Sequence, residues 1–159
     1  MFPFLSSKCI TLKYTKAVDI WSLGCTFAEL LTGKILFPGK NYVQQIKYVI
    51  SYLGTPTEEE MKIIKNPNAL KFIQSLPNKK RVHVKSFIKY ENEDALDLLN
   101  KMLQYDPAKR ITAAEAVKHK YFENVHDPED VQLFKGEIDF DFEKDQNLTL
   151  EKIKLMIIE

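Results

Sequence analysis

The sequence lacks several features that would mark a specialised class of protein. Its only two cysteines, Cys9 and Cys25, show no pairing pattern, which argues against a disulfide-stabilised secreted domain. The formal net charge is only +1, so no overall field favours nucleic acid or an anionic membrane as a partner. The apolar stretch at 17–31 is too short to span a bilayer. The first residues also lack the basic and apolar regions of a secretory signal. We therefore expect an intracellular protein.

Recognisable motifs for nucleotide or metal chemistry are missing too. The pairs Gly33-Lys34 and Gly39-Lys40 lack the upstream glycine and the following Ser or Thr of a phosphate-binding loop, which indicates simple turns. The three histidines have no metal-ligand spacing and no nucleophile nearby in sequence. We therefore predict no catalytic, cofactor-binding or metal-binding residue in this chain.

What the sequence does contain is helical patterning, with no clear strand pattern and no internal repeat. In residues 17–31 apolar side chains occur all around the helical turn, which predicts a helix buried on every face. Gly33 stands where a left-handed helix end is expected. Asp19, near the start of this helix, is most simply interpreted as a cap of its own helix.

Further helices are predicted at 41–53, 92–105 and 148–159, and after the capping boxes that begin at Thr57 and Thr112. The fold class is therefore mainly α. The segment between the middle helices, 65–84, is mixed and polar.

That segment contains Pro67 and Pro77 as helix breakers and ends in a basic run. The run consists of Lys79, Lys80, Arg81, His83 and Lys85. A solvated loop is the simpler interpretation of these residues, and phosphate binding is the alternative.

Several motifs in order resemble the mitogen-activated protein (MAP) kinases. The D-x-W-S-x-G motif of kinases is matched by Asp19, Trp21, Ser22 and Gly24. GTPTEEEM, SLPNKKRV, EDALDLLNKMLQYDPAKRITAAEAVKHKYF and HDPED then follow at the family's spacing. The resemblance covers about Tyr14 to Glu159 and implies an incomplete helical subdomain of the kinase C-terminal lobe (C-lobe).

The resemblance also implies a domain organisation. Residues 1–13 are atypical and replace the end of the activation segment, and 14–122 are a partial kinase C-lobe. A MAP-kinase-type insert lies at about 57–90, and 123–159 form a C-terminal extension with an acidic docking segment and a terminal helix.

Two motif residues would lose their family partners in this chain. In kinases the aspartate that matches Asp19 holds the catalytic loop, and the arginine that aligns with Arg110 pairs with the glutamate of an A-P-E motif. Neither partner motif is present here. Arg110 is therefore expected to be buried without its carboxylate, which would be costly. The alternative is an exposed surface arginine.

Two binding sites are implied by the resemblance. Asp127 and Asp130 match the acidic pair of the common docking site, and residues 127–145 carry eight acidic side chains against two lysines, a balance of −6. Such a field attracts basic peptides, although a solvated tail remains the alternative. A hydrophobic pocket for substrate motifs is matched by Tyr42, Val43, Ile46 and Phe72. For Ile46 and Phe72, core packing is an equal alternative.

These observations predict the C-terminal fragment of a MAP-kinase-like serine/threonine kinase, whose parent would transfer the ATP γ-phosphoryl group with magnesium. The glycine-rich loop, strand lysine, H-R-D and D-F-G motifs of that chemistry are absent, so the chain alone is expected to be inactive. The sequence leaves open whether this chain is part of an active enzyme.

The alternatives are a docking module or decoy, and a truncated gene product. The expected partners are proteins with basic docking motifs, namely substrates, activating kinases and phosphatases, and neither nucleic acid nor a membrane. Self-association through exposed apolar surface is also expected, as is a location in the cytoplasm with access to the nucleus.

Overall fold

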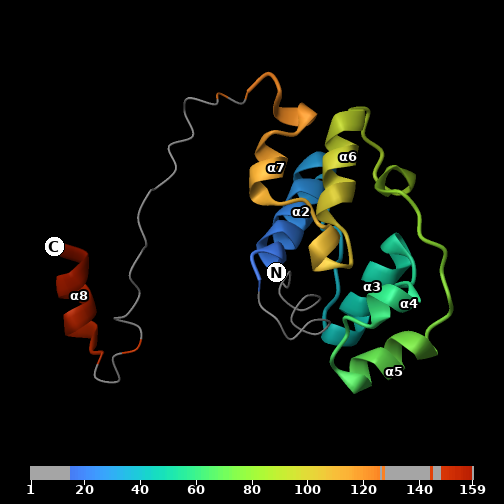
Figure 1. Ribbon diagram of the computed structural model, residues 1–159, viewed down its shortest axis with the longest axis horizontal. Helices are drawn as coiled ribbons and strands as arrows, with labels where there is room; N and C mark the ends of the chain where they lie inside the picture. The colour runs from blue at the N-terminus through green and yellow to red at the C-terminus, as the bar shows by residue number, and fades with distance from the viewer. Residues whose placement is uncertain (1–14, 126, 128–143, 145–147, 159) are drawn as a thin grey trace. The chain divides into compact units, whose positions relative to one another are not determined.

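The computed structural model describes residues 15–125, 127, 144 and 148–158 (Figure 1). The chain divides into two compact units, residues 1–126 and 127–159. All regular structure in the described residues is helical, which confirms the expected mainly α fold. No helix among these residues is both long enough and apolar enough to cross a membrane.

The helices of the first unit follow one another through short loops. The α-helices are α2 (Ala17–Thr32), α3 (Tyr42–Leu53), α4 (Glu58–Met61), α5 (Pro67–Ser75), α6 (Glu93–Met102) and α7 (Ala113–Val117). Three short 3-10 helices lie between or after them: η1 (Val84–Ser86), η2 (Pro107–Lys109) and η3 (Lys120–Phe122). The second unit contains α8 (Leu150–Ile158).

Local capping chemistry sets most of these boundaries. Thr57 and Thr112 each form a complete capping box at the start of α4 and α7, which confirms both predicted helix starts. The side chains of Asn41 and Asn92 cap α3 and α6 by accepting hydrogen bonds from backbone N–H groups of the first turn. Gly33 ends α2 at φ 68°, the left-handed conformation expected there.

Helix α5 was not expected, because Pro67 was interpreted as a helix breaker. Pro67 is instead the first residue of α5, and the side chain of Asn66 accepts hydrogen bonds from Asn68 N and Ala69 N. Proline is well tolerated at this position, since the N–H that it lacks would have no partner inside the helix. The interpretation of Pro67 as a breaker was therefore wrong.

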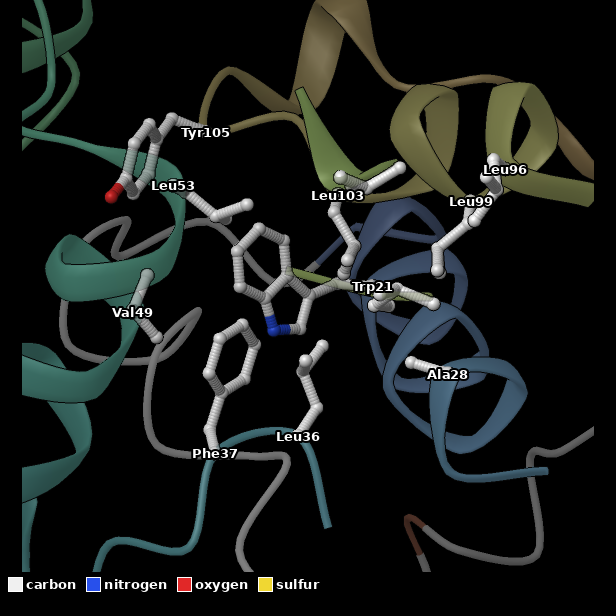
Figure 2. Close-up of a cluster of buried hydrophobic side chains, with 12 residues drawn as sticks. Trp21, Ala28, Leu36, Phe37, Val49, Leu53, Leu96, Leu99, Leu103 and Tyr105 are labelled. Atoms are coloured by element: carbon white, nitrogen blue, oxygen red, sulfur yellow. The ribbon is translucent and has the colours of Figure 1, made fainter. Parts of the chain in front are cut away.

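The core forms around Trp21, which is only 2% exposed. Figure 2 shows its indole ring at the centre of side chains from α2, α3, α6 and the segments between them. Phe37 and Tyr105 stack against the ring at centroid distances of 6.2 and 6.4 Å. Helices α2 and α6 lie side by side and bury the same cluster (Figure 1).

Helices α3 and α5 bury a second, smaller cluster. Ile46 and Ile50 of α3 pack there with Ile64, which follows α4, and with Ala69 and Ile73 of α5. Figure 1 shows α3, α4 and α5 as a neighbouring group beside the α2–α6 pair.

Burial of α2 on every face was predicted, and the structure contradicts it. Val18, Trp21 and Ala28 are buried, whereas Leu23 is 52% exposed and Leu30 is 78% exposed. These two leucines are seven positions apart and therefore share one face of the helix. The composition of α2 indicates a fully buried helix, but the described chain covers only part of its surface.

Candidate functional site

The motif residues of α2 meet Arg110 in one buried cluster. Arg110 is only 8% exposed, and its guanidinium lies over the Trp21 ring, with the central carbon 4.9 Å from the ring centroid. Its nitrogens donate to three backbone carbonyls: Nε to Gln104 at 2.7 Å, Nη1 to Ala17 at 2.8 Å and Nη2 to Tyr105 at 3.3 Å. The alternative of an exposed surface arginine was therefore wrong.

The buried Arg110 cation has no carboxylate bound to it among the described residues. Burial lowers the pKa of its guanidinium from 12.5 to about 10, against the opposing effect of the Asp106 charge. Three carbonyl dipoles and the face of an indole ring thus take the place of a counter-ion.

Burial raises the pKa of Cys25, whereas it lowers that of Arg110. The thiol of this α2 residue has its pKa raised from 9.0 to about 12, mainly by burial, although the charge of Arg110 lowers it somewhat. A thiol with so high a pKa carries almost no thiolate at neutral pH, so Cys25 is not an activated nucleophile.

The remaining residues of the α2 motif have separate roles. Asp19 is exposed and makes no hydrogen bond to a described residue, so capping of its own helix is not observed. Ser22 Oγ donates to Val18 O at 3.1 Å within the helix. Gly24 lies where α2 approaches α6 closely, because a Cβ atom there would lie 3.0 Å from Met102 Cβ.

The four residues of the expected hydrophobic pocket differ in their burial. Ile46 is 2% exposed and lies within the α3–α5 core, while Tyr42 and Phe72 are half-buried and pack against the same cluster. Only Val43, at 41% exposure, presents much of its surface to solvent. For Ile46 and Phe72 the structure therefore shows core packing.

The two residues of the expected acidic docking site belong to the second unit. Asp127 is exposed to solvent. Asp130, like most of the acidic segment 127–145, lies outside the described residues.

One polar network was not foreseen from the sequence. Glu60, only 4% exposed, accepts from Thr57 N through Oε2 at 2.8 Å and from Arg81 Nη2 through Oε1 at 2.9 Å. The Arg81 guanidinium also lies over Tyr105, 5.0 Å from the ring centroid, and the Tyr105 hydroxyl donates to Gly54 O at 2.6 Å. Arg81 therefore ties α4 to the core through Glu60 and Tyr105.

A second unforeseen cluster joins α6 to η3. Asp97 Oδ2 lies 2.6 Å from Lys101 Nζ and 3.0 Å from His119 Nε2. These two hydrogen bonds, that of Lys101 above all, hold the pKa of the Asp97 carboxyl below its usual value. Asp97 and Lys101 show the i, i+4 spacing of a helical ion pair, but nothing local in the sequence indicates His119.

Comparisons with known proteins place this helical unit in a large family. Residues 4–122 match the family model of the protein kinase domain. The mitogen-activated protein kinase mpkB of Aspergillus fumigatus is 48% identical over 151 residues, which are 92% of this chain and 42% of that protein.

Other relatives agree with this match. The mitogen-activated protein kinase 2 of Pneumocystis carinii is 48% identical over 149 residues, which are 91% of this chain and 42% of that protein. The extracellular signal-regulated kinase 1 of Dictyostelium discoideum is 46% identical over 131 residues, which are 82% of this chain and 25% of that protein. The chain thus spans less than half the length of these curated relatives.

Proposed function

The chain belongs to the protein kinase family, and we propose that it forms the C-terminal part of the C-lobe of a MAP-kinase-like serine/threonine kinase. Arg110 carries this proposal. It is buried over the tryptophan of the kinase motif, as expected for an arginine whose carboxylate partner belongs to the A-P-E motif that this chain lacks. The complete kinase would transfer the γ-phosphoryl group of ATP to serine or threonine of protein substrates, in the cytoplasm and the nucleus.

ATP and magnesium are proposed for that longer kinase and not for this chain. In the described part of the chain, no three His, Cys, Asp or Glu residues come together as a possible metal site. The proposed inactivity of the chain alone rests on its sequence, which lacks the glycine-rich loop, strand lysine, H-R-D and D-F-G motifs of phosphoryl transfer.

A chimera tests the main proposal. Residues 14–159 would replace the matching segment of the Aspergillus fumigatus relative, and phosphorylation of a serine/threonine peptide would be measured. An active chimera that loses most of its activity when Arg110→Met is introduced supports the proposal. A folded but inactive chimera contradicts it. Phosphorylation or saturable ATP binding by the isolated chain would contradict the proposed inactivity.

The second candidate function is a docking module or decoy that binds basic docking motifs of substrates, activating kinases or phosphatases. The exposure of Asp127 and the −6 balance of residues 127–145 favour it. Exposed ion pairs contribute only about 0.2–1 kcal/mol each, so we expect a dissociation constant no tighter than roughly 100 μM.

Titration of a labelled basic peptide at low and high salt tests this candidate. The double variant Asp127→Asn/Asp130→Asn is expected to lose most of the binding, and the control Asp139→Asn/Asp141→Asn to lose less. Binding that does not depend on the salt concentration, or that is unchanged in the Asp127→Asn/Asp130→Asn variant, would contradict the docking function.

A further inference from the structure

A groove with a basic rim lies between α3 and the segment that follows α5. Its volume is about 660 Å³. The described residues that line it come from the loop before α3, from one face of α3, and from Leu76, Pro77 and Lys79. Leu76, Pro77 and Lys79 belong to the family-like segment SLPNKKRV, but none of the lining residues was assigned above to the acidic docking site or to the hydrophobic pocket.

The α3 wall of the groove is the solvent-facing stripe of that helix. Gln44, Lys47, Tyr48 and Ser51 line it at intervals of three, one and three residues, so they share one face. From Gln44 to Ser51 this face extends about 10 Å, which is the length of roughly three residues of extended peptide.

Three lysines give the rim its charge. Lys40, Lys47 and Lys79 all line the groove, whereas none of its described lining residues is acidic. No described carboxylate forms an ion pair with any of the three ammonium groups. The groove therefore presents cations whose charge is not neutralised within the described structure.

Apolar side chains line the groove together with the lysines. Ile50, only 4% exposed, contributes from α3, and Leu76 and Pro77 contribute from the opposite wall. Pro38 lines the end near Lys40. The combination suits a ligand that carries an apolar group between anionic groups.

The opposite wall is fixed in place before any ligand arrives. Thr55 N donates to Lys79 O at 2.8 Å, and Lys79 N donates to Thr55 Oγ1 at 2.9 Å. This pair of hydrogen bonds holds the backbone of Lys79 against the end of α3. A preformed wall lowers the entropic cost of binding.

We propose that this groove binds an acidic peptide segment of a partner protein, with one apolar side chain between α3 and Leu76 and with carboxylates against Lys40, Lys47 and Lys79. Its charge is opposite to that of Asp127 and its segment, so the two surfaces select different partners. Three lysines on a concave groove are fewer than the clusters typical of membrane binding, and the wall lacks the stacked aromatic platform of nucleic-acid sites.

Fluorescence polarisation with the full 159-residue chain tests the proposal. The probe is a labelled peptide with one leucine between two pairs of glutamates, and its controls replace the leucine by serine or the glutamates by lysines. The variant Lys47→Ala/Lys79→Ala removes two rim charges, and Lys89→Ala removes an exposed lysine between η1 and α6. Circular dichroism checks that each variant keeps the helical fold.

We expect the groove variant to weaken binding of the leucine peptide about fivefold to tenfold, and Lys89→Ala to leave it unchanged. The serine peptide should bind at least about threefold more weakly, and the lysine peptide should not bind. Equal binding by all variants, or by the leucine and serine peptides, would overturn the proposal. Phosphatidylserine vesicles that retain the chain while the peptide does not bind would also overturn it, in favour of a membrane.

Discussion

Arg110 lies over the ring of Trp21, 4.9 Å from its centroid, and thereby joins the segment after α6 to the middle of α2. The same guanidinium donates to Ala17 O at the start of α2 and to two carbonyls just after α6. A buried cation is normally stabilised by a carboxylate, and here backbone dipoles and an aromatic face take that place. The contact holds together two helices that are separated by the sixty residues 33–92.

The variant Arg110→Met should lower the free energy of unfolding by about 2–4 kcal/mol, because three buried or part-buried carbonyls lose their donor. Arg110→Lys should cost less but still be destabilising, since one ammonium group cannot reproduce the planar fork. Urea unfolding monitored by circular dichroism measures both. Lys109→Met is the matched control, because Lys109 is exposed. A fully stable Arg110→Met variant would show that the carbonyl contacts contribute nothing.

Trp21→Ala should be among the most damaging changes in the chain. Trp21 is 2% exposed and stacks with Phe37 and Tyr105, so its removal leaves a large cavity where α2, α3 and α6 meet. The expected loss is about 3–5 kcal/mol. Tyr90→Ala, at a 41% exposed aromatic residue, is the control and should change stability little. Urea unfolding measures the change in stability of both variants. Comparable losses of stability for Trp21→Ala and Tyr90→Ala would argue against Trp21 as the centre of the core.

The substitution Gly24→Ala should have two opposing effects on stability. Alanine favours a helix over glycine by about 1 kcal/mol. The added Cβ, however, would lie 3.0 Å from Met102 Cβ and 3.2 Å from Leu103 Cδ2, so these neighbours would have to shift. Overpacking of this kind costs about 1–3 kcal/mol, so we expect net destabilisation.

The thermal midpoint provides the measurement for Gly24→Ala, with Thr26→Ala on the exposed part of α2 as control. A loss of 1 kcal/mol should lower the midpoint by about 2–4 °C in a chain of this size. A raised midpoint would mean that helix propensity prevails over the crowding between α2 and α6.

Stability should also depend on pH through Asp97. Its folded-state pKa lies below 3.8, mainly because of the hydrogen bond from Lys101, so its contribution is present above pH 3.8 and is lost as pH falls through the folded-state pKa. Asp97→Asn should cost about 0.5 kcal/mol near neutral pH, since the side chain is half exposed and screened by solvent. The two proteins should converge in acid, whereas Glu91→Gln should show no such trend. A constant difference across the acid range would argue against the Asp97 linkage.

The parts of this fold that follow from local chemistry could be predicted from the sequence. The capping boxes at Thr57 and Thr112 and the left-handed Gly33 depend on residues within one or two turns, and all three were confirmed. The prediction for Pro67 was wrong because proline can either break a helix or stand at its first position. Here the capping side chain of Asn66, directly before Pro67, is the local feature that indicates a helix start.

Contacts between distant segments could not be predicted in the same way. The bonds of Arg110 to three carbonyls and of Glu60 to Arg81 depend on how loops return to the core, which no spacing in the sequence encodes. The basic run shows this most clearly: Arg81 turns to Glu60, whereas Lys79 lines a groove with lysines from around α3. Basic residues that are neighbours in the sequence thus have different environments, and only the structure shows which of them is paired and which lines the groove.

The exposed face of α2 predicts self-association of the isolated chain. Leu23 and Leu30 expose 52% and 78% of their surface on one side of this helix, and burial of each leucine would gain about 1.5–3 kcal/mol. Two copies that pair through this face would bury four such side chains. We expect sedimentation equilibrium to show an average mass that rises with concentration, and the double variant Leu23→Ser/Leu30→Ser to sediment closer to a monomer.

Val125→Ser provides the matched control, because Val125 is 78% exposed but lies outside α2. It removes exposed apolar surface without touching the proposed contact, so its self-association should equal that of the unchanged chain. If both variants reduce association equally, the cause is nonspecific association of exposed apolar side chains, and the α2 face is not a specific contact. If the chain stays monomeric at every concentration, the two leucines do not attract a second copy, because the cost of ordering and desolvating the surrounding polar groups exceeds the gain from burial.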